Sequence, residues 1–445
     1  MPSSDAAYQS IIDLEAALTG EVREAAVTES LEISLRSADG CVHSRKICFP
    51  TRWLADKRPT LTLYCAAQMN NLAMTIGGLE LAVVGSRPQL GAQIIAEMQR
   101  RYRQVTNVLS RYYAHEIQFL NVDKPPHAET ERPAQRDTRH PLPGVTMGIN
   151  LGQTLTKLIL VEDGETLGQW AKVFPTWPAK DGRDFQTLMN ALNLQIAQTR
   201  KAFGRPIRAF AIAIGGIVRN GRLVTRSGVA AQVPPSDYEQ IAAIAEHMAA
   251  IHAVPTLLCQ DAAAKAHALA DASPARTLLL DIGTSTGGAF LSSGIAPDYV
   301  NQVGRVVLDI SANALARDDG EAVGVMSKYV SLWGLLHARA EYGLEAFSLE
   351  AIGDLARENH PAARALLRYF SGLLRDGVRL LNQYYAADNV VLTGGIMQSA
   401  LGALVVDMLK SDSEPIASTL PTITTSFNPL LDGAIGAAKL ASCLR

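Results

Sequence analysis

The stretch TLLLDIGTSTGGAFLSSG, residues 277–294, decides the fold. An apolar run carries Asp281 to its end, and a turn rich in glycines and hydroxyl groups follows before the next apolar run. Such a turn presents backbone N–H groups, hydroxyls and a carboxylate to phosphate oxygens and Mg²⁺, because no bulky side chain blocks the approach. A purely structural turn seldom needs so many glycines and hydroxyls beside an aspartate. We therefore predict a second phosphate turn made of Gly283, Thr284, Ser285 and Thr286, with Asp281 as a metal ligand.

A related strand–turn–strand unit occurs earlier, in GINLGQTLTKLILV, residues 148–161. Its turn combines a glycine with small hydroxyl groups, which suits close approach of a phosphate. A hairpin that needs glycine only for its backbone conformation explains this segment equally well when it is considered alone. The predicted first phosphate turn and its flanks consist of Asn150, Gly152, Thr154, Thr156 and Lys157.

A third motif is NVVLTGGIMQSALGALVVDMLK, residues 389–410, which predicts a strand, a glycine pair and a helix. Paired glycines let a flat base lie close to the backbone, and a helix N-terminus favours nearby phosphate. We assign Gly394, Gly395 and Gln398 to nucleotide binding. The later stretch LLDGAIGAAKLA predicts a helix of small residues, from about Asp432, that packs tightly against a sheet.

The rest of residues 144–445 alternates apolar runs with helical segments, which predicts an α/β fold. Several of these runs are almost entirely apolar and end in glycine, as central strands covered on both faces do. The two similar strand–turn–strand units indicate a duplicated architecture of two lobes with a cleft between them.

Residues 121–144 read NVDKPPHAETERPAQRDTRHPLPG, where prolines and charges replace apolar periodicity, so they predict a linker. Before the linker, the sequence predicts a hairpin around Ala38–Gly40, helices at 61–73 and 94–113, and a closing strand near Glu116. This part is a small α/β domain whose sequence does not reveal its task.

Composition excludes several classes of protein. Lys and Arg total 41 against 43 Asp and Glu, so a net charge of −2 provides no general attraction for nucleic acid or an anionic membrane. The five cysteines form no CxxC pair and no Cys/His cluster, which indicates reduced thiols in a cytoplasmic protein. The N-terminal segment lacks a signal-peptide pattern, and the apolar run at 79–84 is too short to span a bilayer. We therefore expect no export and no membrane partner.

The order and spacing of the motifs resemble the actin-like ATPase and sugar kinase superfamily, and within it the ROK family. The phosphate turns lie about 130 residues apart, and AIAIGGIVRNGRLVTRSG, residues 211–228, is similar to that family's Gly-Ile-Val segment. The stretch LLCQDAAAKAHALA, residues 257–270, lies where the family carries an Asn-Asp-Ala-Asn helix start. The resemblance covers about two thirds of the chain. It implies ATP and Mg²⁺ as cofactors and places Asp261 at the general-base position, although an aspartate that opens a helix also serves as an N-cap.

The resemblance further implies a two-lobed actin-like ATPase with ribonuclease H-like lobes, preceded by a small α/β N-terminal domain. The expected boundaries are 1–122 for the N-terminal domain, 123–143 for the linker and 144–445 for the kinase core. Within the core, lobe I is expected at about 144–265 plus the C-terminal helix, and lobe II at about 266–430.

The chain departs from the family pattern in two places. Asn150 stands where typical members have an aspartate, so metal binding must depend more on Asp281. The stretch NQVGRVVLDIS, residues 301–311, lacks the family's Gly-Glu-x-Gly-His segment, and no cysteine cluster follows it. We therefore expect no zinc and an acceptor other than an ordinary hexose, with Arg305 and Asp309 as candidate substrate-binding residues unless they are structural charges.

The leading prediction is an ATP-dependent kinase of a small hydroxylated molecule, with a small-molecule acceptor and no nucleic acid as partner. The second is a catalytically silent ligand sensor or regulator, and the third is an actin-like ATPase that acts with a protein partner. Regulators of the family place a winged helix-turn-helix first, whereas this chain opens with a hairpin, and a solvated face explains the modestly basic helix MQRRYRQVTNVLSRYY. The oligomeric state stays open, with a homodimer as one candidate.

Overall fold

The computed structural model of the chain describes residues 8–38, 40–85, 87–125, 142–178, 182–269, 275–297, 299–316, 323–411, 420–426, 428 and 430–444. The chain forms two compact units. Unit 1 comprises Met1–Ala134, Leu280–Gly288 and Asp298–Thr425, and unit 2 comprises Gln135–Leu279, Ala289–Pro297 and Ser426–Arg445.

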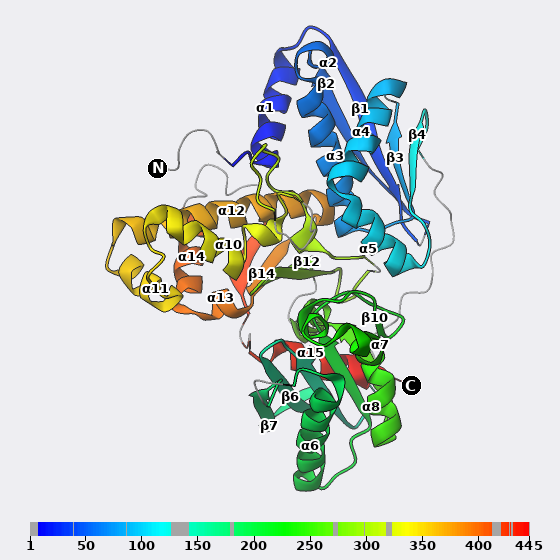
Figure 1. Cartoon of the computed structure of the whole chain (residues 1–445), viewed down its shortest axis with the longest axis vertical. Coiled ribbons are helices and arrows are strands. Elements are labelled where there is room, and N and C mark those ends of the chain that lie inside the picture. The colour runs from blue at the N-terminus through cyan, green and yellow to red at the C-terminus, as the bar shows by residue number, and fades with distance from the viewer. Residues whose placement is uncertain are drawn as a thin grey trace. The chain divides into compact units, whose positions relative to one another are not determined.

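Unit 1 begins with the predicted N-terminal domain, whose sheet has the strand order β2-β1-β3-β4 (Figure 1). Strands β1 and β2 pair antiparallel and confirm the hairpin. Helix α3 packs against β1, and α4 packs against β3 and β4. The elements of this domain are α1 Ile11–Glu24, β1 Thr28–Arg36, β2 Val42–Pro50, α2 Trp53–Asp56, α3 Arg58–Thr75, β3 Glu80–Val84, α4 Pro88–Arg101, α5 Arg103–Tyr113 and β4 Gln118–Val122.

Two features of this domain differ from the sequence-based expectation. The single helix predicted at 94–113 is two helices, α4 and α5, because Tyr102 leaves the helical conformation with φ −120° and ψ 30°. The sequence also gave no expectation of α1, which starts where the Ser10 hydroxyl accepts a hydrogen bond from the Ile12 N–H. Most of the predicted linker, residues 126–141, lies outside the described residues.

A second sheet has the strand order β13-β12-β14-β15; β14, β15 and the long helix α12 belong to unit 1, whereas the residues of β12 and β13 are divided between the two units. Strands β14 and β15 run parallel. Helix α14 packs against both α11 and α12, so the helices form one cluster beside the strands. The elements are β12 Thr277–Ile282, β13 Thr286–Leu291, α10 Leu332–Ala338, α11 Leu349–Arg357, α12 Pro361–Tyr385, β14 Asn389–Thr393, α13 Gly395–Gln398, α14 Ala400–Ser411 and β15 Thr422–Thr425.

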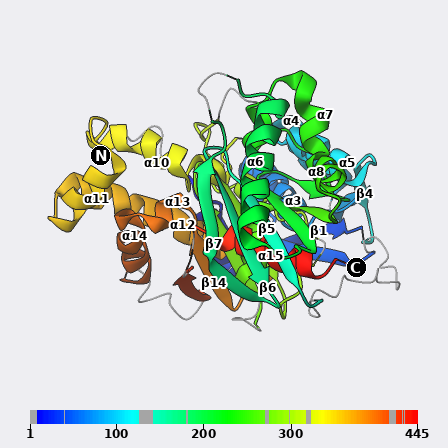
Figure 2. The ribbon, with the colours of Figure 1, turned by 90° about the horizontal axis from the view of Figure 1, so that it is seen from below.

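Unit 2 is built on a five-stranded sheet of order β11-β8-β5-β6-β7, of which β5, β6 and β7 are labelled in Figure 2. β5 pairs antiparallel with β6 and parallel with β8, and β8 pairs parallel with β11. The elements are β5 Val145–Leu151, β6 Leu155–Glu162, β7 Glu165–Pro175, α6 Phe185–Phe203, β8 Ala209–Ile214, β9 Val218–Arg219, β10 Arg222–Leu223, α7 Tyr238–Ala242, α8 Ile244–His252, β11 Thr256–Gln260, α9 Asp261–Leu269 and α15 Asp432–Ser442. β7 was not expected from the sequence.

The two faces of this sheet are covered differently. Alternate residues of β5, among them Met147 and Ile149, join a large apolar core with α6 and α8. The opposite face meets α15 through small residues: a β-carbon on Gly148 would lie 1.8 Å from the Ala434 carbonyl oxygen. The predicted small-residue helix that packs against a sheet is therefore confirmed, and glycine is required at the contact because any side chain would collide with backbone.

Candidate functional site

The second phosphate turn lies between β12 and β13 in unit 1. The side chains of Thr284 and Ser285 are exposed at its tip. The Gly283 N–H donates to the Ser285 carbonyl oxygen at 3.0 Å, and the Leu332 N–H donates to the Gly283 carbonyl oxygen at 2.8 Å. The Thr286 hydroxyl donates to the Val330 carbonyl oxygen, so this hydroxyl holds the turn in place.

Asp281 and the glycine pair after β14 lie against each other. Gly394 has φ +99°, and a β-carbon there would lie 2.5 Å from Asp281 Oδ1 and 2.5 Å from the Ile282 carbonyl oxygen. Only glycine fits this position, because both the backbone conformation and the space exclude a side chain. Next to it, Gly395 is exposed and has no atom within 4 Å of a β-carbon position, and Gln398 is exposed at the end of α13. The structure thus brings a carboxylate, an exposed hydroxyl turn and an open glycine surface together in one unit.

The first phosphate turn lies between β5 and β6 in unit 2, where Asn150 pairs in register with Lys157. Lys157 Nζ lies 3.5 Å from the position of a β-carbon on Gly152, so the ammonium group lies beside the turn backbone. The Asn150 side chain is buried, and a β-carbon on Gly433 at the start of α15 would lie 2.3 Å from its Nδ2. The cation and the amide therefore both lie at this turn.

Thr176 was missed by the sequence analysis and holds the first turn from inside. Its hydroxyl donates to the Gly152 carbonyl oxygen at 2.7 Å and lies 2.9 Å from the Thr156 hydroxyl. Its N–H donates to the Thr154 carbonyl oxygen at 3.0 Å. Thr156 is buried in these contacts, whereas Thr154 is exposed, so of the two predicted hydroxyls only that of Thr154 faces solvent.

Asp261 opens α9 directly after β11, as the sequence predicts. Its Oδ1 accepts from the Ala262 N–H at 2.8 Å, and its Oδ2 lies 3.5 Å from a β-carbon position on Gly215. One oxygen therefore bonds the helix start while the other faces the glycine loop after β8, and the base and cap interpretations both stay open. Burial and then the Asp261 carboxylate raise the pKa of the Cys259 thiol to about 12, so this neighbouring thiol stays protonated at neutral pH.

The hydroxyls of Thr225 and Ser227 lie against the glycine loop after β8, which Asp261 faces. Gly216 has φ +128°, and a β-carbon there would lie 2.6 Å from Ser227 Oγ and 3.1 Å from Thr225 Oγ1. Thr225 Oγ1 accepts from the Ile217 N–H at 2.9 Å, and the two hydroxyl oxygens are 3.2 Å apart. These two hydroxyls were not predicted from the sequence.

The sequence matches a family model described as the ROK family over residues 146–442. The chain belongs to the ROK family. A comparison with curated proteins finds no match.

Solved ROK structures share the fold over 67% of this chain. A ROK hexokinase from Thermus thermophilus is 18% identical, with a TM-score of 0.55 and 98% of its own chain covered. A ROK glucokinase from Streptomyces griseus, solved with glucose and AMPPNP, is 17% identical, with a TM-score of 0.54 and 99% covered. A ROK transcriptional regulator, a homologue of the E. coli Mlc protein, is 15% identical, with a TM-score of 0.53 and 77% covered. The two-lobed actin-like α/β fold predicted from the sequence is confirmed, and the ROK fold occurs in both kinases and a regulator.

Arg305 and Asp309, predicted to contact the acceptor of this ROK protein, take part in contacts within unit 1. The Arg305 carbonyl oxygen accepts from Asn70 Nδ2 at 3.0 Å. Asp309 is 3% exposed, and its carboxylate accepts from the Tyr329 hydroxyl and from the N–H groups of Gln9 and Ser311. These contacts agree with the structural alternative for Asp309, so we leave it out of the proposed site.

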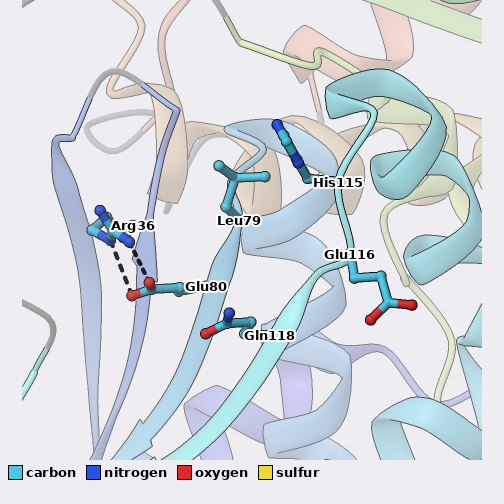
Figure 3. A pocket seen from close by; sticks show the side chains of 6 residues that line it. All are labelled: Arg36, Leu79, Glu80, His115, Glu116 and Gln118. Carbon is cyan, nitrogen blue, oxygen red and sulfur yellow. Dashed lines mark hydrogen bonds and ion pairs between the residues drawn. The ribbon is translucent and has the colours of Figure 1, made fainter.

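A separate hollow of about 400 Å³ is lined by residues of the N-terminal domain (Figure 3). Arg36 and Glu80, on neighbouring strands, form a two-bond ion pair across part of it. The other lining residues are Leu79, His115, Glu116 and Gln118. Because the cation and the carboxylate already neutralise each other, we assign no ligand to this hollow.

The described part of the chain has neither a cluster of metal ligands nor a membrane-spanning helix. No group of three or more His, Cys, Asp or Glu side chains there is arranged to hold a metal ion. No described helix has the length and hydropathy to cross a membrane. The expectation of no zinc stays a prediction.

Proposed function

We propose that this ROK protein binds ATP with Mg²⁺ and transfers the terminal phosphate to a hydroxyl of a small polar molecule. The observation that carries the proposal is the contact of Asp281 with Gly394. Asp281 leaves no room for a side chain at Gly394. The exposed hydroxyl turn can bind phosphate, the carboxylate can bind a metal ion, and the open surface at Gly395 can take a flat base.

The residues fit a magnesium-bound nucleotide. Mg²⁺ prefers oxygen ligands and keeps several waters, so the half-buried Asp281, followed in the chain by the exposed Thr284 and Ser285, suits it. Bound Mg²⁺ would neutralise charge on the phosphates. Lys157 supplies a further positive charge at the first turn, where Asn150 adds none.

Asp261 is assigned as the base that accepts the proton of the acceptor hydroxyl. A kinase of this kind has little covalent work beyond aligning phosphate with a hydroxyl, so a single positioned carboxylate suffices. Oδ2 faces the glycine loop, while Oδ1 is held by the Ala262 N–H, which fixes the orientation of the carboxylate.

We infer the class of the acceptor from the hydroxyl groups near Asp261 and from the positions where the sequence differs from typical family members. The hydroxyls of Thr225 and Ser227 can hydrogen-bond polar atoms of an acceptor. Residues 301–311 lack the Glu and His of typical family members, so we assign a polyhydroxylated or amino-containing acceptor other than an ordinary hexose.

A ligand sensor is the second candidate, and Asn150 is the observation that favours it. A neutral amide contributes less to holding hydrated Mg²⁺ than a carboxylate, which weakens catalysis more than ligand binding. A silent sensor retains nucleotide or acceptor binding and shows no acceptor-dependent ATP consumption.

The test is calorimetry and thermal shift with ATP and Mg²⁺, followed by ATP consumption with a panel of polyols, sugars and amino sugars. Millimolar ATP should raise the melting temperature of the wild type, because it binds the folded state. Asp261→Asn should leave ATP affinity nearly unchanged and lower turnover by about 100-fold or more. Equal turnover of variant and wild type would defeat the base assignment, and folded protein that shows neither heat nor thermal shift would defeat the nucleotide proposal.

A further inference from the structure

The segment at residues 300–310 connects the N-terminal domain to the second phosphate turn within unit 1. The last carbonyl groups of a helix have no partner inside it and must be satisfied elsewhere. At the end of α3, the carbonyl oxygens of Met74, Thr75 and Ile76 accept from the N–H groups of Gln302, Asn301 and Val300 at 2.8, 3.1 and 3.1 Å. The segment therefore caps α3 in place of a glycine or a side chain.

Asn71, in the last turns of α3, grips the same segment through its side chain. Its Oδ1 accepts from the Val307 N–H at 2.6 Å, and its Nδ2 donates to the Val307 carbonyl oxygen at 3.2 Å. Asn70 donates to Asn71 Oδ1 and to the Arg305 carbonyl oxygen, each at 3.0 Å. Both side chains are fully buried. Asparagine is a poor helix former and costly to bury unpaired, and the bonds to Val307 pair both polar atoms of Asn71, whereas Asn70 is bonded through its Nδ2.

The start of the N-terminal domain holds the other end of the segment. The Ile11 N–H donates to the Leu308 carbonyl oxygen at 2.9 Å, and the Ile310 N–H donates to the Gln9 carbonyl oxygen at 3.1 Å. Residues 300–310 are thus fixed at both ends and in the middle by residues of the N-terminal domain.

The segment also lies against the second phosphate turn. A β-carbon on Gly304 would lie 2.1 Å from the Thr286 carbonyl oxygen, so the two backbones are in direct contact. Beyond it, the Met326 N–H donates to the Val306 carbonyl oxygen at 2.7 Å, and the nearby Val330 carbonyl oxygen holds the Thr286 hydroxyl. Packed interiors transmit displacement because they contain few voids, so a shift of the segment must move the turn.

We infer that the N-terminal domain positions the second phosphate turn through the segment 300–310, with Asn71 as the positioning residue. The inference rests on the proposed function only where it concerns ATP; the mechanical connection between Asn71 and the turn is independent of any ligand. The N-terminal domain is then a part of the nucleotide site's support and not a separate module joined by a linker.

The test uses the full chain with two variants of α3. Asn71→Ala removes the grip on Val307, whereas Leu61→Ala, ten residues earlier and also fully buried, weakens the same helix about 15 Å away along its axis. Hydrogen exchange is followed in peptides that cover residues 277–290, and ATP affinity is measured by calorimetry. Asn71→Ala should speed exchange in these peptides by about tenfold and weaken ATP binding by about tenfold, while Leu61→Ala should leave both near wild type.

Unchanged exchange at residues 277–290 in Asn71→Ala, or an equal change in Leu61→Ala, would overturn the inference. If the wild type binds no ATP, the proposed function fails. The hydrogen-exchange rates of the α3 variants still test whether Asn71 positions the second phosphate turn. If Asn71→Ala does not fold, Asn70→Ala replaces it, because that variant removes only the bonds from Asn70 to Asn71 and Arg305. Its effect on exchange should be smaller but confined to the same peptides.

Discussion

The two phosphate turns of this ROK protein share a strand–turn–strand plan but differ in charge. The first, between β5 and β6, carries the Lys157 ammonium beside Gly152 and a neutral amide at Asn150. The second, between β12 and β13, carries the Asp281 carboxylate against Gly394. Under the proposed function, the first turn would offer phosphate a direct positive charge and the second would offer a carboxylate for Mg²⁺. Two turns with similar backbones can thus neutralise phosphate in different ways, one with a cation and the other through a metal ion. The following variants test this difference.

The largest effect is expected at the second turn, from Gly394→Ala. The new methyl group would occupy the space of Asp281 Oδ1 and force an alanine to φ +99°. We expect ATP affinity to fall by about 100-fold, equivalent to about 2.7 kcal/mol, and stability to fall by about 1–3 kcal/mol from backbone strain. Calorimetry and denaturant unfolding measure the two quantities.

Gly395→Ala is the matched control for that variant. No atom lies within 4 Å of its β-carbon position, so stability should stay within about 0.5 kcal/mol of the wild type. Wild-type ATP affinity in Gly394→Ala would show that Asp281 and the glycine pair do not form a nucleotide site.

At the first turn, Lys157→Met should weaken ATP binding by about tenfold, because a positive charge beside the turn is lost. The loss should shrink as salt is raised, since salt screens charges that are open to solvent. Lys172→Met on β7 removes the same charge elsewhere on the sheet and should change ATP affinity little. If both variants weaken ATP binding equally, the net charge matters and the position of Lys157 does not.

Thr176→Val should destabilise the protein by about 1 kcal/mol, because it leaves the Gly152 carbonyl oxygen and the buried Thr156 hydroxyl without their shared partner. Thr154→Val, at the exposed tip of the same turn, should stay within about 0.5 kcal/mol of the wild type. Chemical denaturation of the two variants provides the measurement. If Thr154→Val lowers the free energy of unfolding as much as Thr176→Val, the buried hydrogen bonds of Thr176 do not stabilise the turn.

The smallest effect is expected from Asn150→Asp, which makes the two turns more alike. A second carboxylate beside the phosphates should lower the Mg²⁺ concentration needed for half-maximal ATP binding by about threefold. Gln153→Glu adds the same charge at an exposed position of the turn and should leave this concentration unchanged. If Asn150→Asp alters only thermal stability, Asn150 has a structural role against Gly433 and α15.

The sequence predicted those parts of the molecule whose cause is local. Apolar runs ending in glycine marked β5, β8, β12 and β14, and the glycine at 394 marked a turn position that no other residue can occupy. Residues whose partners are remote escaped prediction. Thr176 follows a strand that was not recognised, and its value lies in bonds to a turn more than twenty residues earlier.

The N-terminal domain shows the same limit more clearly. Its hairpin was visible in the alternation of apolar residues, but nothing around Asn70 and Asn71 indicates which backbone they bind. For Asp309 the sequence left a substrate contact and a structural role open, and the bonds of its carboxylate to Tyr329 and to backbone N–H groups agree with the structural role. Side-chain bonds to remote backbone leave no periodic pattern in the sequence, so only the structure reveals them.

Helix α15 has a consequence for how the protein is made. It lies directly on the backbone of β5 through Gly148 and of α9 through Gly436, where a β-carbon would lie 1.6 Å from the Ala264 carbonyl oxygen. These contacts join residues 432–442 to strands that begin at Val145, with most of unit 1's second sheet synthesised in between. During translation, domains whose residues are contiguous can fold as they emerge. Unit 2 is not contiguous: the part of its sheet face that α15 covers stays open until residues 432–442 are made, about 170 residues after the last strand, β11, ends at Gln260.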